Sequence, residues 1–235
     1  MCNLYTSTPA PRLALVFNVV PPASEYPHTI APLRSGPFVT HSTGAQVGQW
    51  GMIPPSSKTR TPKTSKGQRM STNNCRREGM ARSWTFGQAW RDGQRCLIPA
   101  ENFDEPNWES GKNEWWRFAR ADGEPWALAG LWSVWTDPET GEIVPSYTMI
   151  TQNCDAHPLL RRMHKPDPKL AADQQDKRAV VPLERDQWDQ WLNGNTQQAE
   201  SLIQLPAEHL FAHGPAAAPS LAPPQTSIPP EPELF

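Results

Sequence analysis

The sequence predicts one α+β domain with a curled, mainly antiparallel, barrel-like sheet flanked by short helices. Three observations predict this class. Short apolar segments bounded by turn residues recur along the 235-residue chain, as expected for strands. The 27 prolines leave little room for long helices. The few helical patterns do not alternate regularly with the strands, which disfavours a parallel α/β sheet.

Strands are expected in short runs rich in apolar and β-branched residues. A turn at Asp122-Gly123 should join two of them, and a second turn is expected over residues 137–141. The predicted strands are residues 37–41, 46–53, 95–99, 115–119, 126–135, 147–151 and 178–183.

Helices are expected where apolar residues recur at the spacing of a helical turn. Leu13, Val16, Phe17 and Val20 show this spacing shortly after a proline. The predicted helices are residues 9–20, a segment through Trp84 and Trp90, a short helix capped by Asp155 and running toward His164, residues 184–192 and residues 196–205.

We expect residues 2–210 to form the domain and residues 211–235 to form a Pro-rich, disordered tail. From Gly214 onward the chain has seven prolines and neither Lys nor Arg. Such a segment buries too little apolar surface to fold.

The cysteines and the hydropathy pattern exclude several classes of protein. Cys2, Cys75, Cys96 and Cys154 form no C-x-x-C pair, which argues against a zinc site or a redox dithiol. No run approaches the ~20 apolar residues of a membrane span, and the N-terminus lacks a signal-peptide pattern. We therefore expect no metal, no cofactor and no membrane partner. The expectation is a monomer with reduced thiols in the cytoplasm, associated with the nucleoid if the source is bacterial.

The net charge of −2 hides a lopsided distribution. Residues 1–77 hold one acid, Glu25, against nine Lys/Arg, and no acid lies between Tyr26 and Arg77. Five of these cations lie in the loop 56–70. The block is a candidate anion-binding surface, with nucleic-acid phosphate as the first candidate. The alternative is a solvated basic loop that is balanced by acids elsewhere in the fold.

The first two residues, Met1-Cys2, offer a specific chemistry. Removal of Met1, which a small second residue permits, leaves an α-amine and a thiol on adjacent carbons. Such a 1,2-aminothiol condenses with an aldehyde to an imine, and the thiol then closes a thiazolidine ring. The second step is intramolecular, with an effective molarity of roughly 10⁵ M or more. The alternative is that Cys2 is an accident of sequence.

Several motifs accompany Met1-Cys2, and their order and spacing matter more than any one of them. They are Trp-Gly-Met-Ile-Pro at 50–54, Asn-x-Arg-x-Glu at 74–78, Arg-Cys-Leu-Ile-Pro-Ala at 95–100 with Phe-x-Glu at 103–105, Ala-Gly-Leu-Trp at 129–132, and a late histidine, His164. Over roughly residues 2–192 this series resembles the SRAP family, the SOS response-associated peptidases.

The resemblance implies an abasic-site processing protein. In this family the N-terminal cysteine captures the ring-opened aldehyde of an abasic site and forms a stable thiazolidine DNA–protein crosslink. The implied partner is single-stranded DNA that contains abasic sites. The implied enzyme is an autocatalytic peptidase, which removes Met1, with a lyase-like crosslinking activity.

The resemblance also implies the catalytic residues, which are Cys2, Asn74, Glu105 and His164. Cys2 supplies both nucleophiles, and Asn74 would bind the abasic sugar or orient Cys2. Glu105 would move protons at the α-amine, and His164 would protonate the leaving sugar oxygen. A surface salt bridge is the alternative role for Glu105.

Two of these assignments have neighbours that compete with them. Asn73 is the alternative to Asn74, and His157 is the alternative to His164.

The implied DNA-binding residues are Trp50, Arg76, Arg77, Thr151 and Arg178. The arginines would bind phosphates, Trp50 would stack on a base beside the lesion, and Thr151 would lie near the strand. The alternatives are a core position for Trp50 and an ion pair between Arg76 and Glu78.

The chain departs from the family pattern at three places. Asn3-Leu4 follows Cys2 where the family has Gly-Arg, and Pro106 follows Phe-x-Glu where the family has Trp. Residues 165–177 separate His164 from Arg178, which the family keeps close together. The DNA contact of Arg178 is the role most affected.

Two other functions are open at this point. One is an N-terminal-nucleophile cysteine peptidase that acts on other proteins through Cys2, Glu105 and His164. The other is a noncatalytic nucleic-acid-binding module, which the near-neutral pI of about 6.3 disfavours.

Overall fold

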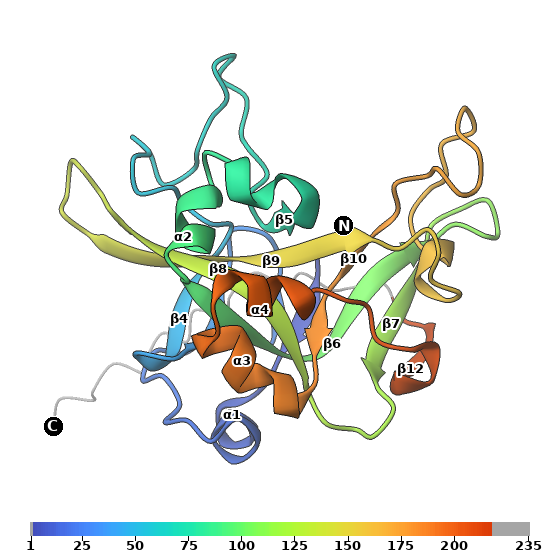
Figure 1. The fold of residues 1–235 in the computed structure, drawn as a ribbon, viewed down its shortest axis with the longest axis horizontal. Helices are drawn as coiled ribbons and strands as arrows, with labels where there is room; N and C mark the ends of the chain where they lie inside the picture. Colours follow the sequence, from blue (N-terminus) through green and yellow to red (C-terminus); the bar gives the residue numbers. More distant parts are fainter. Residues whose placement is uncertain (1, 218–235) are drawn as a thin grey trace, which may run out of the picture.

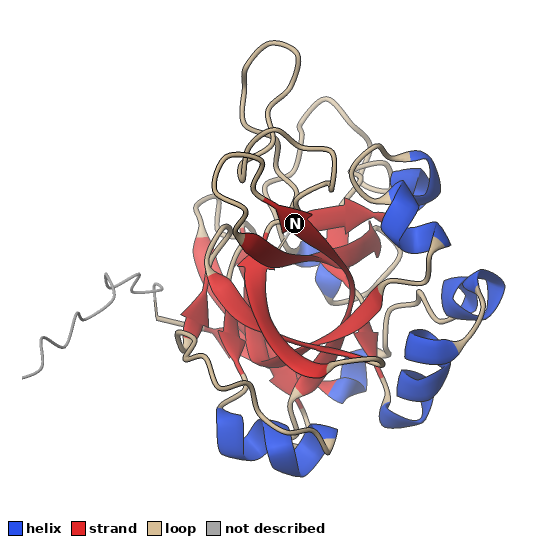
Figure 2. Ribbon diagram, turned by 90° about the vertical axis from the view of Figure 1, so that its left-hand side faces the viewer, coloured by secondary structure: helices blue, strands red, loops and turns tan. Residues whose placement is uncertain are grey.

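The computed structural model describes residues 2–217, and a closed five-stranded barrel lies at its centre. The barrel strands are β3 (Ser35–Thr40), β4 (Gly44–Trp50), β6 (Arg95–Asn107), β8 (Trp126–Thr136) and β9 (Ile143–Asn153). The ring runs β6–β8–β9–β4–β3 and back to β6, and Figure 2 shows the closed barrel nearly end-on. β4 and β9 pair in parallel, and the other ring pairs are antiparallel. The predicted fold class is confirmed.

Shorter strands extend this barrel. They are β1 (Tyr5–Ser7), β2 (Thr29–Ile30), β5 (Asn74–Arg76), β7 (Glu114–Arg120), β10 (Arg178–Val180), β11 (Pro182–Leu183) and β12 (Phe211–Pro215). The second half of β6 leaves the ring and pairs with β7 and with β1. β5 and β10 both pair with β9, so these strands meet near the N-terminus (Figure 1).

Short helices pack around the barrel. The α-helices are α1 (Ala10–Phe17), α2 (Gly87–Arg91), α3 (Trp188–Asn193) and α4 (Thr196–Ser201). The 3-10 helices are η1 (Arg77–Arg82), η2 (Leu160–Arg162), η3 (Arg185–Gln187) and η4 (Glu208–Leu210). Within residues 2–217, no helix has the length and apolar character that crossing a membrane would require.

Two apolar layers lie on opposite faces of the barrel wall. Trp126 and Leu128 of β8 join the interior layer, whereas Ala129 and Leu131 join the layer that packs under the helices. Strands that are buried on both faces read as nearly continuous apolar runs. This explains the unbroken apolar segment at residues 126–131.

Several predicted boundaries are wrong. The helix through Trp84 and Trp90 is instead η1 and α2 with a turn between them, because α2 folds back so closely that a Cβ on Gly87 would lie 2.8 Å from the Ala81 carbonyl oxygen. The helix predicted for residues 9–20 ends at Phe17, where Asn18 takes a left-handed conformation with φ 53°. The strand predicted for residues 95–99 continues to Asn107, because β7 takes over as its partner where β8 ends.

Two predictions near the C-terminal half also need correction. Asp155 does not cap a helix, because its carboxylate accepts the backbone N–H groups of Asp176 and Lys177, both at 2.9 Å. Phe211–Pro215 was expected in the tail, but it forms β12 and pairs with β7. The rest of the predicted tail, residues 218–235, lies outside the described part of the chain.

Gly130 should be intolerant of a side chain. A Cβ there would lie 2.7 Å from Cδ1 of Ile98, 2.8 Å from the Thr148 carbonyl oxygen and 2.9 Å from Sγ of Cys96. Gly130→Ala should therefore lower the free energy of unfolding by about 1–3 kcal/mol, measured by urea denaturation. The control is Gly79→Ala, where a Cβ meets nothing within 4 Å. It should leave stability unchanged or raise it by up to about 1 kcal/mol. Equal effects at the two positions would contradict this explanation.

Candidate active site

The pairing of β1 with β6 brings the N-terminus to Glu105. Tyr5 lies opposite Phe103, and the backbone N–H of Asp104 donates to the carbonyl of Leu4 at 3.1 Å. Continuing this antiparallel register carries residue 2 toward the end of β6, where Glu105 lies. The strand that follows Cys2, β1, is therefore paired into the sheet and brings Cys2 toward Glu105.

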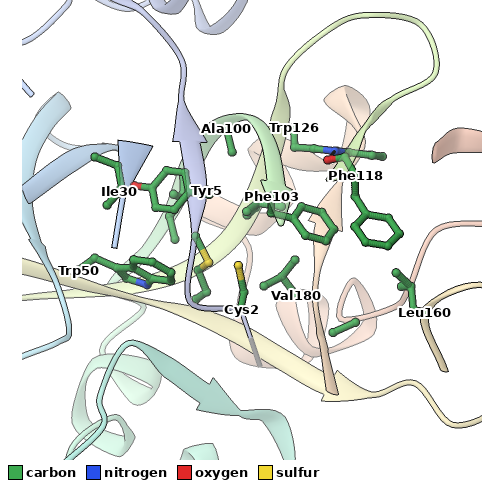
Figure 3. Close-up of a cluster of buried hydrophobic side chains, with 14 of the residues drawn as sticks. Cys2, Tyr5, Ile30, Trp50, Ala100, Phe103, Phe118, Trp126, Leu160 and Val180 are labelled. Atoms are coloured by element: carbon green, nitrogen blue, oxygen red, sulfur yellow. Dashed lines mark hydrogen bonds between the residues drawn. The ribbon is translucent and has the colours of Figure 1, made fainter. Parts of the chain in front are cut away.

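Cys2 is fully buried at one end of the barrel interior. Its side chain lies close to Phe103 and Val180 in the interior cluster (Figure 3). The thiol donates to the carbonyl of Leu4 at 3.3 Å. Burial raises the pKa of the Cys2 thiol well above its usual value, and the Glu105 carboxylate raises it further. The thiol is therefore neutral at pH 7.

Asn73 and Asn74 hold the backbone of Cys2. The side-chain amides of Asn74 and Asn73 donate to the Cys2 carbonyl at 2.7 Å and 3.3 Å. Asn73 is itself fixed, because its carbonyl accepts the indole N–H of Trp50 at 2.9 Å. Both asparagines thus contact Cys2, and the alternative Asn73 acts together with Asn74 rather than in its place.

Glu105 and His164 form a buried pair beside Cys2. Nε2 of His164 lies 3.2 Å from Oε2 of Glu105, and the Glu105 side chain is only 3% exposed. Nε2 also lies 3.2 Å from the carbonyl oxygen of Arg178. Because both neighbours are acceptors, the proton of the neutral imidazole belongs on Nε2. Glu105 is no surface salt-bridge residue.

The polar atoms of this site are incompletely paired. Among residues 2–217, Oε1 of Glu105 and Oδ1 of Asn74 accept no hydrogen bond, and Oε2 of Glu105 has the 3.2 Å contact with His164. Buried polar atoms are normally paired, so orphaned acceptors indicate a site that awaits donors. The donors that would satisfy them are an ammonium group and hydroxyl groups.

Burial also sets the charge of His164. It lowers the pKa of the imidazole below its ordinary value, and the Glu105 carboxylate acts in the opposite direction. The imidazole is neutral at pH 7 and becomes a stronger acid than free histidine once it is protonated. Proton transfer between this pair and a bound group is therefore possible near neutral pH.

His164 reaches an open pocket. Its side chain is 19% exposed and lines a pocket of about 630 Å³ together with Trp108, Arg161 and Lys177. His157 has a different task, because its Nδ1 accepts the backbone N–H groups of Leu159 and Leu160 and its Nε2 contacts the Pro206 carbonyl. His157 is therefore a structural residue.

Trp50 and Thr151, two of the predicted DNA-binding residues, are fully buried. Trp50 is 0% exposed and meets Tyr5 edge-on at 5.1 Å, so its indole belongs to the core and does not stack on a base. Thr151 is also 0% exposed, and its hydroxyl donates to the Cys75 carbonyl at 3.4 Å. Both expectations are wrong for the same reason, since β4 and β9 are covered on both faces.

The three predicted arginines differ from one another. The Arg76 side chain is 53% exposed and pairs with Asp176 at 2.8 Å rather than with Glu78. Arg178 is 5% exposed and bonds both Glu78 and Asp176. Arg76 is therefore accessible to a phosphate, whereas the Arg178 guanidinium is held inside an ion-pair network.

Arg77 forms its contacts outside this ion-pair network. Its guanidinium pairs with Glu200 at 2.7 Å and donates to the Ile203 carbonyl at 3.1 Å. It therefore ties η1 to α4.

The basic loop 56–70 projects from the barrel wall between β4 and β5 (Figure 1). Its cations are largely exposed, and Arg60 pairs with Glu142 at 3.4 Å. The loop ends close to Asn73, so its root adjoins the candidate site.

Sequence reasoning missed Lys177. Its ammonium contacts the carbonyls of Met163 and His164. The available signal was the long segment between His164 and Arg178, whose ends must be joined at the site.

Within residues 2–217, no group of three His, Cys, Asp or Glu side chains is arranged to hold a metal ion.

Several known proteins are similar to this chain. A crystal structure of a protein from Bordetella bronchiseptica superposes with a TM-score of 0.81 at 33% identity, covering 92% of this chain and all of that one. A second crystal structure, from Bacteroides thetaiotaomicron, shares the fold at 17% identity with a TM-score of 0.70, covering 92% of each chain.

Two curated relatives carry the name "Abasic site processing protein HMCES". The one from Xenopus tropicalis is 31% identical over 122 residues, 44% of this chain and 35% of that protein. The one from Pongo abelii is 26% identical and matches 90% of this chain and 60% of that protein. The present chain thus spans less than two thirds of either relative.

Residues 1–214 match the family described as SOS response associated peptidase (SRAP). This match covers the barrel, the paired N-terminus and every residue of the candidate site. The chain belongs to the SRAP family.

Proposed function

We propose that the protein captures abasic sites in single-stranded DNA through Cys2, after removal of Met1, and forms a covalent thiazolidine crosslink. The observation that carries this proposal is the convergence of Cys2, Asn74, Glu105 and His164 at one end of the barrel. The names of the two curated relatives support the same substrate.

The chemistry joins one aldehyde to two nucleophiles of one residue. The α-amine of Cys2 adds to the aldehyde carbon, and loss of water gives an imine. The thiol then adds across the C=N bond, with sulfur bound to carbon and the thiol proton passing to nitrogen. The product is a thiazolidine ring, and the sum of the two steps releases one water.

The neighbouring groups supply the proton transfers. Glu105 takes a proton from the Cys2 ammonium, which frees the amine to attack, and returns it to the departing hydroxyl. His164, once protonated, donates to the ring oxygen of the closed sugar and favours the open-chain aldehyde. Asn74 fixes the Cys2 carbonyl and offers its unpaired Oδ1 to a sugar hydroxyl.

The DNA strand approaches the protein from the side on which His164 is exposed. That side holds the pocket of about 630 Å³, and Arg161 on its rim is exposed. Arg76 is the exposed cation beside Cys2's partner Asn74 and is suited to a neighbouring phosphate.

Met1 removal is the first step of this proposal. The Cys2 thiol attacks the Met1 carbonyl, and the C–N bond breaks as the thioester forms, so the amine takes up a proton and is freed in this step. Water then hydrolyses the thioester, which releases Met1 as a free amino acid and restores the thiol. The protein is then a peptidase toward its own first peptide bond.

Cys2→Ala should abolish the covalent adduct. The variant keeps an amine but has no thiol, so only a reversible imine can form. Untagged protein is incubated with an abasic oligonucleotide, and the adduct is measured on a denaturing gel. Cys96→Ala, which alters another fully buried cysteine, is the control and should crosslink normally. A persistent adduct in Cys2→Ala, or none in the unaltered protein, would contradict the proposal.

Glu105→Gln should slow the crosslinking step about 10²–10⁴-fold at saturating DNA, the usual range for loss of a general acid–base. The matched control is Glu109→Gln, a carboxylate just beyond β6 that pairs with Arg162 at the surface. That control should react within about twofold of the unaltered protein. Single-turnover kinetics provide the rate constants, and similar losses in both variants would be evidence against the role of Glu105.

The contribution of His164 should grow in acid. Because burial lowers its pKa below the ordinary ~6.5, the protonated imidazole accumulates only as the pH falls below that value. The ratio of crosslinking rates, unaltered protein over His164→Gln, should therefore rise from pH 8 to pH 5. Dividing the two rates removes the titration of the α-amine, which both proteins share. A ratio that stays constant or falls in acid would refute the proton-donor role.

A further inference from the structure

The backbone of His164 is held in an unfavourable conformation. Its φ of 65° lies in the left-handed region, which costs a residue other than glycine of order 1 kcal/mol or more. The backbone N–H of His164 donates to the Pro106 carbonyl at 2.6 Å, and Met163 forms a bridge with Asn107 at the end of β6. These contacts fix the start of a long loop, residues 165–176.

Lys177 directly follows this loop and contacts the residues at its start. The Lys177 ammonium donates to the Met163 carbonyl at 2.7 Å and to the carbonyl of His164. Its own backbone is anchored to the two residues that follow β9, because Cys154 N–H donates to the Lys177 carbonyl at 2.8 Å and the Asp155 carboxylate accepts the Lys177 N–H at 2.9 Å. The Lys177 side chain thus connects the two ends of the loop, and the Lys177 backbone connects them to the barrel.

The ammonium is placed for carbonyl groups rather than for a carboxylate. Lys177 is 7% exposed, and within residues 2–217 no carboxylate oxygen lies within 4.0 Å of its nitrogen. Burial lowers the pKa of this lysine, so its position costs free energy. The two hydrogen bonds from the ammonium to the carbonyls of Met163 and His164 offset that cost.

We propose that Lys177 is a positioning residue that holds the His164 turn so that the imidazole stays against Glu105. The proposal rests on the proposed function in that it assigns Lys177 to the same proton-transfer step. It explains how this chain keeps His164 at the site although a long segment separates it from Arg178. The Lys177 ammonium bonds the carbonyls of Met163 and His164 rather than Cys2.

The kinetic test compares Lys177→Met with the unaltered protein. The crosslinking rate constant at saturating abasic oligonucleotide should fall about 10- to 100-fold, because a displacement of ~1 Å can cost about 10²-fold. The dissociation constant for the same oligonucleotide without the lesion should change by less than about twofold. Lys177→Arg, which keeps a charged donor, should recover part of the rate. Lys169→Met is the control, since Lys169 is an exposed lysine in the loop of residues 165–176. This variant should behave as the unaltered protein.

A double-mutant cycle separates positioning from general damage to the fold. If Lys177 acts through His164, Lys177→Met should change the rate by less than about twofold in a His164→Gln background. Full additivity of the two substitutions, or an unchanged rate in Lys177→Met alone, would overturn the proposal. Urea unfolding establishes first that each variant is folded. If Lys177→Met is not, Lys177→Gln takes its place, with the same outcomes.

A second readout needs no crosslinking. The pKa of His164 is measured by NMR titration with Glu105 intact and in Glu105→Gln, both in the unaltered protein and in Lys177→Met. Glu105→Gln should lower the His164 pKa, because the Glu105 carboxylate raises it. If Lys177 holds the imidazole against Glu105, this decrease should be smaller in the Lys177→Met background. If the unaltered protein formed no adduct, the proposed function would fail while this measurement still tested Lys177. A decrease of the same size in both backgrounds would contradict the positioning role.

Discussion

The pairing of β1 with the second half of β6 is the constraint on which the candidate site depends. Terminal residues are usually frayed and solvated. Here the register of Tyr5 opposite Phe103 leads the first residues into the barrel end. Two asparagine amides then fix the Cys2 carbonyl. The Cys2 thiol, which would otherwise move in water, is thus held near the Glu105 carboxylate, which contacts the His164 imidazole.

The electrostatics of this site favour neutral nucleophiles. Burial raises the pKa of Cys2 and lowers that of His164, so both side chains are uncharged at pH 7. The proposed reaction consumes no net charge, because an amine, a thiol and an aldehyde become a thiazolidine and water. Glu105 is the acceptor that such a reaction needs, and its Oε1, which accepts no hydrogen bond within residues 2–217, indicates that a donor belongs there.

Local patterns and the family resemblance differ in what they predict. Short apolar runs are sufficient to predict a curled sheet, because strand length and turns are local properties. They do not reveal that β6 changes partners and continues to Asn107, since this depends on β7 far along the chain. The grouping of Asn74, Glu105 and His164 came from the resemblance, as no spacing in the sequence indicates it.

Burial explains the site predictions that are wrong. Trp50 and Thr151 lie in strands whose outer face is covered as well as the inner one, and a motif alone cannot distinguish a buried indole from an exposed one. Arg178 is withdrawn by Glu78 and Asp176, which lie 100 and two residues away in sequence. Such a network requires the fold to be known, as does the contact of Lys177 with the turn of His164.

The central claim is that a free amine and a thiol on the same residue react with one aldehyde. Intact-mass spectrometry of the protein before and after reaction with an abasic oligonucleotide tests it most directly. The account predicts a starting protein that lacks Met1 and a product whose mass equals protein plus DNA less one water, stable to denaturation without a reducing agent. A product that forms while Met1 is retained, or one of any other composition, would contradict it.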